Sequence, residues 1–236
     1  MNKGTEITDE KKTGVSVTPF EIKDCALIVR ISDIIPAINL RELRERISSC
    51  PVDSLYHHFC ETVVRPSFDD PEFHNDFAIW ARRALHDHIL TERLEILDPY
   101  AFSNIEELRK ELLDIIGDRL SEVPFIPWAL NENAFFFHSA TTVIFNTNIT
   151  IERPEDLGQA ISRMTTSSLY YHFWEARRRT PDQTDDFSVW LRDWNDRGEP
   201  LIAAYSEVDF YFMSLRELQD KLVRITGRIL KNGGDR

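Results

Sequence analysis

The residues of this chain that could do chemistry occur in two matched sets. The segment Ser54–Glu61 reads SLYHHFCE, and the segment Ser168–Glu175 reads SLYYHFWE. Four polar residues recur at the same spacing: Tyr56, His58, Glu61 and Arg65 in the first set, and Tyr170, His172, Glu175 and Arg179 in the second. Residues three and four apart are neighbours on a helix, so each set predicts a His-Glu-Arg ladder along one helix flank.

The first interpretation of the ladder is structural. His58 falls on the same helix face as Leu55 and Phe59, which predicts a half-buried imidazole that a neighbouring group satisfies. His57 is matched by Tyr171, so the adjacent histidine pair is interpreted as a surface ring beside an inner one. On this interpretation the paired residues are mainly scaffold.

Two functional interpretations compete with the structural one. In an enzyme such as a hydrolase or lyase, His58 or His172 would act as general base, oriented by Glu61 or Glu175. The same four side chains would also be the ligands of a metal shared between the two sets. The known helical di-iron pattern runs Glu-x-x-His, however, and this one runs His-x-x-Glu, so no metal is assigned.

A binding surface is the third interpretation. Its candidate ligand contacts are the aromatic and basic members of the sets: Tyr56, Arg65, Tyr170 and Arg179. The sequence has no phosphate-binding glycine loop, nucleophile elbow or zinc-protease signature, and it identifies no cofactor.

The matched sets belong to a longer repeat. An offset of 114 residues aligns Leu43–Arg65 with Leu157–Arg179, and after a loop shortened by four residues an offset of 110 aligns Asp76–Leu120 with Asp186–Leu230. Self-similarity over this length predicts a tandem duplication of one module, arranged about an approximate two-fold axis.

Composition narrows the class of protein. Apolar residues make up 42% and charged residues 29% of the 236 residues, as in a globular protein. The net charge of −12 disfavours nucleic acid and anionic membrane surfaces as partners. Three cysteines without ligand-like spacing and no apolar leader favour the cytoplasm, and no segment is apolar enough to cross a membrane. Oligomeric state is left open.

The predicted fold is α+β and mainly helical, with a short strand pair and about four helices in each module. The strand-forming segments are Phe20–Ile35 and Ala134–Ile151, and helices are expected over residues 40–48 and 154–164. Further helices begin at Asn75 or Asp185, and at Asn104 or Ser214 with a glutamate three residues on. Trp80 and Trp190 are expected in the core.

The predicted domain boundaries follow the repeat. Residues 1–15 form a flexible tail, residues 16–122 the first module, residues 132–231 the second, and residues 232–236 a C-terminal tail. The segment between the modules, residues 123–131, contains Phe125, Ile126, Trp128 and Leu130. Such an apolar linker is expected to be buried and to dock the modules against each other.

The Ser-Leu-Tyr-x-His-Phe segments are followed by Asn-Asp-Phe-Ala-x-Trp at Asn75–Trp80 and by Asp-Asp-Phe-Ser-x-Trp at Asp185–Trp190. In these motifs the chain resembles a bacterial and archaeal family of uncharacterised proteins, catalogued as a domain of unknown function. The resemblance covers both copies and implies a self-contained module without assigning catalytic residues. The expected function is therefore non-catalytic binding of a small ligand or protein partner between two similar modules, with an enzyme or a structural, oligomer-forming protein as alternatives.

Overall fold

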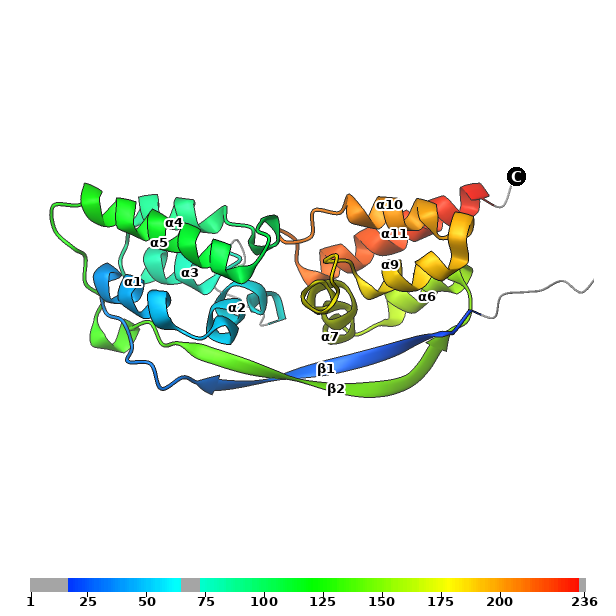
Figure 1. Cartoon of the computed structure of the whole chain (residues 1–236), viewed down its shortest axis with the longest axis horizontal. Helices are drawn as coiled ribbons and strands as arrows, with labels where there is room; N and C mark the ends of the chain where they lie inside the picture. Colours follow the sequence, from blue (N-terminus) through cyan, green and yellow to red (C-terminus); the bar gives the residue numbers. More distant parts are fainter. Residues whose placement is uncertain (1–16, 65–72, 234–236) are drawn as a thin grey trace, which may run out of the picture.

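The fold is mainly helical α+β, as expected, with two groups of helices lying side by side above a two-stranded ribbon (Figure 1). The computed structural model describes residues 17–64 and 73–233. The first group contains α1 (Leu40–Ser49), α2 (Val52–Cys60), α3 (Asp76–Arg83), α4 (His88–Glu95) and α5 (Ile105–Glu122). The second contains α6 (Pro154–Arg163), α7 (Thr166–Leu169), α8 (Ala176–Arg179), α9 (Asp186–Leu191), α10 (Glu199–Ser206) and α11 (Leu215–Gly233). We call these groups the first and second halves.

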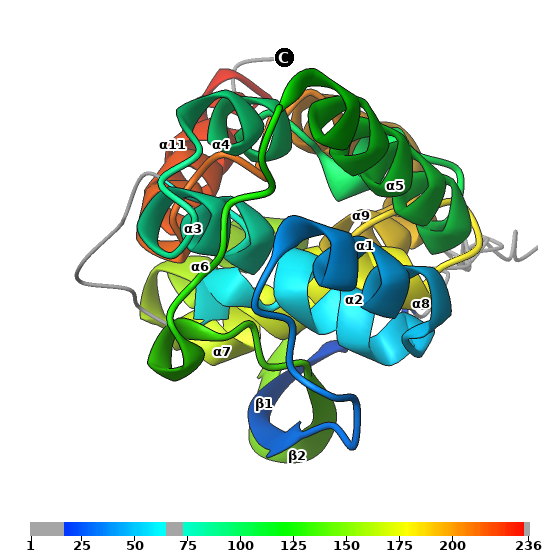
Figure 2. The ribbon, with the colours of Figure 1, turned by 90° about the vertical axis from the view of Figure 1, so that its left-hand side faces the viewer.

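The ribbon differs from the expected arrangement. Each module was expected to hold its own strand pair, but β1 (Phe20–Ile31) and β2 (His138–Ile151) pair with each other in one antiparallel sheet. The ribbon runs beneath both halves and projects below the helices when viewed from one end (Figures 1 and 2). The expectation was wrong because each segment forms one long strand, and its pairing groups are satisfied by the strand of the other half.

The start of each strand segment also packs in the core of the other half. Phe20 and Ile22 of β1 pack in the second core with residues of α6 to α11, whereas Phe135 and Phe137, just before β2, pack in the first. The Phe20 ring lies among aromatic rings of α9, and the Phe135 ring lies among those of α3. The start of each strand segment therefore belongs to the opposite half from the one its place in the sequence predicts.

The tryptophans of α3 and α9 fix these strand segments. The expectation that both are core residues is confirmed, since Trp80 and Trp190 are each 7% exposed. Trp80 Nε1–H donates to the backbone carbonyl of Asn133 at 2.8 Å, and Trp190 Nε1–H donates to that of Thr18 at 2.9 Å. Each indole thus joins its helix to the chain that enters the exchanged strand.

The predicted helix starts are confirmed. Asn75 and Asp185 are the N-caps of α3 and α9, and Asn104 is that of α5. At the start of α11, Ser214 Oγ accepts from the backbone N–H of Glu217 and the Glu217 carboxylate accepts from that of Ser214. These local hydrogen bonds satisfy amides that have no partner within the helix.

The expectation of a buried linker was wrong. Phe125 is 87% exposed, and Trp128 and Leu130 are each 65% exposed. The segment runs along the outer end of the first half and not between the halves (Figure 1), held by a hydrogen bond from Ala129 N–H to the carbonyl of Ile38. Ile126 and Ala129 pack against the first core, so the linker is attached to the first half and does not dock the two halves.

The halves meet through side chains of α2, η4 (Tyr170–Glu175, a π-helix) and the segment before α11. The Tyr211 hydroxyl donates to the carbonyl of Phe59 at 3.2 Å, and the Tyr100 and Phe210 rings lie 4.8 Å apart. None of the helices in the described part of the chain combines the length and apolar character needed to cross a bilayer.

Candidate binding site between the two halves

His58 and His172 both bind a strand backbone. The N–H of His138 donates to His58 Nε2 at 3.0 Å, and the N–H of Lys23 donates to His172 Nε2 at 2.8 Å. Since a backbone amide can only donate, each Nε2 must be unprotonated, and each ring carries its proton on Nδ1. That nitrogen lies 2.6 Å from Asp76 Oδ2 in His58 and 2.8 Å from Asp186 Oδ2 in His172. Both nitrogens of each ring are therefore engaged in holding the fold.

A serine completes each of these contacts. Ser54 Oγ donates to the carbonyl of His138 at 2.7 Å, and Ser168 Oγ donates to that of Lys23 at the same distance. In each strand, one residue, His138 or Lys23, is therefore held at both backbone groups. Its N–H is bound by a histidine, and its C=O is bound by the serine that lies four positions before that histidine in sequence. The Ser-x-x-x-His spacing places both side chains on one helix face, where they bind the strand edge.

The predicted His-Glu-Arg ladder does not form in the first half. Glu61 pairs with His57, whose Nδ1 lies 2.5 Å from Glu61 Oε2, and not with His58. The interpretation of His57 as a surface ring is wrong, because this side chain is fully buried. Helix α2 lies between β2 and the second half, so opposite flanks of the helix are buried at once.

Of the two predicted arginines, Arg65 lies outside the described residues and only Arg179 can be placed. Arg179 lies 2.9 Å from Asp186 Oδ2, and its guanidinium stacks 4.2 Å from the centre of the Tyr171 ring. Arg178 stacks 4.6 Å from the Tyr56 ring and pairs with Asp53 at 2.7 Å. Arg178 is therefore the arginine that reaches across to the first half.

The remaining predicted residues come together at the junction. The Tyr56 hydroxyl donates to Glu175 Oε2 at 3.1 Å, which joins α2 of the first half to the π-helix of the second. Beyond the effect of burial, Glu61 lies close enough to raise the pKa of Glu175, and Tyr170 lies close enough to raise that of Tyr56. The junction cluster consists of these four residues with three that the sequence analysis did not select: Tyr56, His57, Cys60, Glu61, Tyr100, Tyr170 and Glu175.

Burial dominates the electrostatics of the junction cluster. It raises the pKa of Glu175 despite the nearby guanidinium of Arg178, and the carboxylate of Glu61 acts in the same direction. Burial also raises the pKa of the Tyr56 and Tyr170 hydroxyls well above the usual value. The tyrosines therefore remain neutral donors, and Glu175 holds a proton more readily than an exposed glutamate.

Several polar atoms of the cluster are unsatisfied. Among the described residues, His57 Nε2 and Trp174 Nε1, nearby in the π-helix, are buried without a hydrogen-bond partner. The buried hydroxyls of Tyr100 and Tyr170 lie beside that of Tyr56 but form no hydrogen bond of good geometry. A buried polar group without a partner is costly, and such groups are normally satisfied by ordered water or by a ligand. A small polar molecule at the junction would supply these missing partners.

The geometry does not assemble the metal set. Among the described residues, no three His, Cys, Asp or Glu side chains are grouped so that they could hold a metal ion. His58 and His172 face the two strands, whereas Glu61 and Glu175 face the junction. The general-base arrangement of His58 with Glu61 likewise does not form, because the ring pairs with Asp76.

Sequence reasoning missed His57, Cys60 and Tyr100 for one reason. Candidate residues were selected because they recur in both copies, and these three have no identical counterpart. The signal available for His57 was its spacing of four residues from Glu61, which is as favourable on a helix as the spacing of three from His58. No local signal identifies Tyr100, which reaches the cluster from the short 3₁₀ helix η2 (Pro99–Ala101) before α5.

The fold and the site define a mainly helical α+β protein with a buried polar junction between its two halves. The chain belongs to a family of unknown function, DUF5752, whose model matches residues 17–227, and the expected resemblance is confirmed. The chain is also similar to the solved structure of OrfY from Thermoproteus tenax, with 25% identity and a TM-score of 0.73, covering 90% of this chain and 95% of that one. No curated protein matches the sequence.

Proposed function

We propose that this chain is a non-catalytic binding protein whose junction cluster recognises a small polar molecule between two similar modules. The observation that carries the proposal is the group of buried atoms at the junction without a hydrogen bond of good geometry, His57 Nε2 and the hydroxyls of Tyr100 and Tyr170. Two glutamates in the cluster disfavour an anion, so the ligand is uncharged or cationic and rich in hydrogen-bonding groups, such as a polyol or an amine.

A hollow at the surface supports access to this region. It has a volume of about 530 Å³ and is lined by His74, Glu92, Glu95 and Ile96 of the first half and by Phe212 of the second. Tyr211 packs against His74 and donates a hydrogen bond to the carbonyl of Phe59, the residue before Cys60. Movement of the segment that carries Tyr211 and Phe212 would open a path from the hollow to the cluster.

We further propose that the two halves arose by tandem duplication about an approximate two-fold axis, with modules over residues 16–122 and 132–231. The equivalent contacts of His58 and His172 with opposite strands support this origin. A cytoplasmic location is part of the proposal and suits three cysteines that remain free thiols.

A thermal-shift panel of polyols, sugars, amines, nucleotides and metal ions tests the binding function. We expect at least one uncharged or cationic compound to raise the melting temperature, and we expect Tyr170→Phe to abolish that shift. Tyr205→Phe is the matched control, because it removes a buried hydroxyl that is bonded to Thr226 and lies outside the cluster. The proposal fails if no compound stabilises the protein and native mass spectrometry of the purified chain finds no bound small molecule, or if both variants lose the shift equally.

One observation favours the alternative of an oligomer-forming protein. The ribbon face that carries Ala26, Ile28, Val143 and Phe145 is solvent-exposed, with Ile28 60% and Phe145 49% exposed. Such an apolar strand surface promotes association, here with a second copy of the chain. Light scattering after size exclusion would show a dimer that Ile28→Asp dissociates and Ile96→Asp, on an exposed helix end, leaves intact. A monomer at all concentrations removes this alternative.

A further inference from the structure

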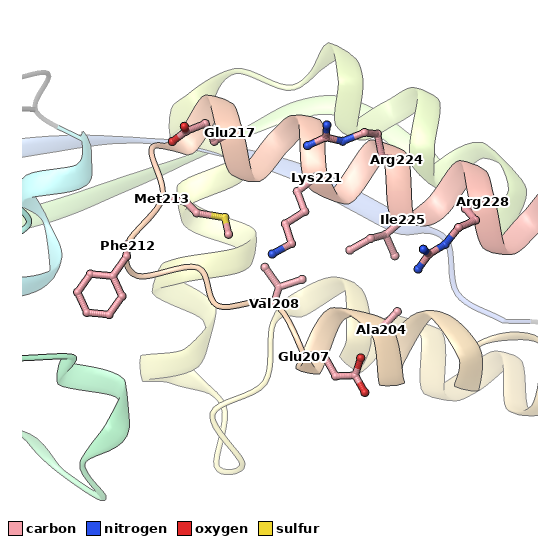
Figure 3. A pocket seen from close by; sticks show the side chains of 10 residues that line it. All are labelled: Ala204, Glu207, Val208, Phe212, Met213, Glu217, Lys221, Arg224, Ile225 and Arg228. Atoms are coloured by element: carbon pink, nitrogen blue, oxygen red, sulfur yellow. The ribbon is translucent and has the colours of Figure 1, made fainter. Parts of the chain in front are cut away.

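A groove lies between α10 and α11 in the second half (Figure 3), and one of its lining residues, Phe212, also lines the surface hollow near the junction. Its volume is about 850 Å³, within the range of small-molecule sites. Five apolar side chains line it: Ala204 and Val208 from the α10 side, Phe212 and Met213 from the connecting segment, and Ile225 from α11. These side chains offer an apolar surface to the body of a ligand.

Three cations line the α11 wall of the same groove. Lys221, Arg224 and Arg228 are three and four residues apart, so they lie along one flank of the helix. Figure 3 shows Lys221 and Arg228 projecting toward α10 on either side of Ile225. Within residues 17–64 and 73–233, none of the three forms an ion pair. Their charges are therefore available to a ligand.

Two carboxylates also line the groove, but neither neutralises these cations. Glu217 accepts hydrogen bonds from the backbone and hydroxyl of Ser214, where it caps α11. Glu207 lies at the end of α10 on the opposite wall (Figure 3). The α11 wall is thus cationic and the floor apolar, in a chain whose net charge is −12.

The matched helix of the first half shows that the fold does not require these cations. The 110-residue offset aligns Lys221, Arg224 and Arg228 with Glu111, Asp114 and Asp118 of α5. The apolar positions between them are retained, since Leu112 and Leu222 are both fully buried. All three charges are reversed while the core positions are kept, so a structural need for positive charge does not explain the α11 residues.

We propose that the groove between α10 and α11 binds an anion with an apolar body, such as an acyl carboxylate or an alkyl phosphate. Lys221 and Arg228 would contact the anionic head, with Arg224 adding to the local positive potential. Val208, Met213 and Ile225 would contact the apolar body. This site is separate from the junction cluster, where two glutamates disfavour anions.

Isothermal titration of the full chain with octyl phosphate at low ionic strength tests this site. We expect saturable binding that weakens with added salt, because the contact depends on exposed charges. Inorganic phosphate should bind at least tenfold more weakly, since it lacks the apolar body, and octanol should bind at least tenfold more weakly, since it lacks the charge. The proposal is wrong if octyl phosphate does not bind up to several millimolar, or if inorganic phosphate binds equally, which would indicate only a nonspecific anion effect.

The aligned residues of α5 define the variants that test this groove. Lys221→Glu and Arg228→Asp each introduce the residue that α5 carries at the matched position, and we expect each to weaken octyl phosphate binding about tenfold or more. Arg216→Glu is the control, because it makes the same charge change on α11 at a residue that does not line the groove. Circular dichroism confirms folding. Equal loss in Arg216→Glu would show that only the overall charge matters and would overturn the site.

Discussion

The two halves hold their strands in the same way but present opposite charges on their last helices. His58 and His172 each bind a backbone amide through Nε2 and an aspartate through Nδ1. Helices α5 and α11 share their apolar positions, yet α5 has acidic residues where α11 has basic ones. The contacts that recur maintain the fold, and the positions that diverge are where a difference in binding between the halves can arise.

The repeated histidines have a structural role in both halves. Retention of His58 and His172 in both halves is explained by strand binding, which each half needs once. The proposed binding sites also use residues that occur once, such as His57 at the junction and the cations of α11. Recurrence within this chain therefore does not by itself distinguish scaffold residues, such as His58, from junction residues, such as Tyr170.

The largest expected effect tests the exchange of strands between cores. Phe20→Ala should destabilise the protein by about 3–5 kcal/mol, because the ring is buried among aromatic side chains of the second half. Hydrogen exchange should accelerate in α9 more than in α3. In Phe135→Ala the order should reverse, and faster exchange confined to the half that follows the mutated strand in sequence would contradict the exchanged arrangement.

Removing one strand-binding histidine should have the next largest effect. His172→Ala leaves the Lys23 amide and the Asp186 carboxylate without this partner, at a cost of about 3 kcal/mol in urea unfolding. His58→Ala should cost a similar amount. Gln can place an acceptor near the position of Nε2, so His172→Gln should recover part of the loss. A loss below about 1 kcal/mol in either alanine variant would show that the histidines are not the scaffold.

The sequence predicted the helices well because their signals are local. The caps at Asn75, Asp185 and Ser214 act within one turn, and the apolar spacing of α1 and α6 identifies their buried faces. It also identified four members of the junction cluster, because Tyr56, Glu61, Tyr170 and Glu175 recur.

The pairing of strands across the halves could not be predicted in the same way. Whether Phe20 packs on α3 or on α9 depends on contacts more than a hundred residues apart, and both helices offer the same aromatic pattern. The linker was misread because Phe125 and Trp128 are large and apolar, although their positions at the outer end of the first half leave them exposed. Tertiary geometry decides both features.

A smaller effect is expected from the hydrogen bond that joins the halves. Tyr56→Phe removes the donor to Glu175 Oε2 and should cost about 1 kcal/mol. A double-mutant cycle with Glu175→Gln measures this contact directly, and we expect the two changes to be non-additive by a few tenths of a kcal/mol or more. Strict additivity would mean that the two side chains do not interact and that the junction is held by its apolar contacts.

The smallest effect is a change in pH dependence. Burial raises the pKa of Glu175 above its ordinary value of 4.5, so the folded protein binds this proton more tightly than the unfolded chain does. The wild type therefore loses stability relative to Glu175→Gln as the pH rises from 4.5 through the folded-state pKa, because only the wild type must bury a charge. Urea unfolding of both proteins between pH 4.5 and 8 should show the difference shifting steadily in favour of the glutamine variant. A constant difference would mean that Arg178 fully compensates the buried carboxylate, and a shift in favour of the wild type would mean that the junction stabilises the ionised form and could accommodate a cation only.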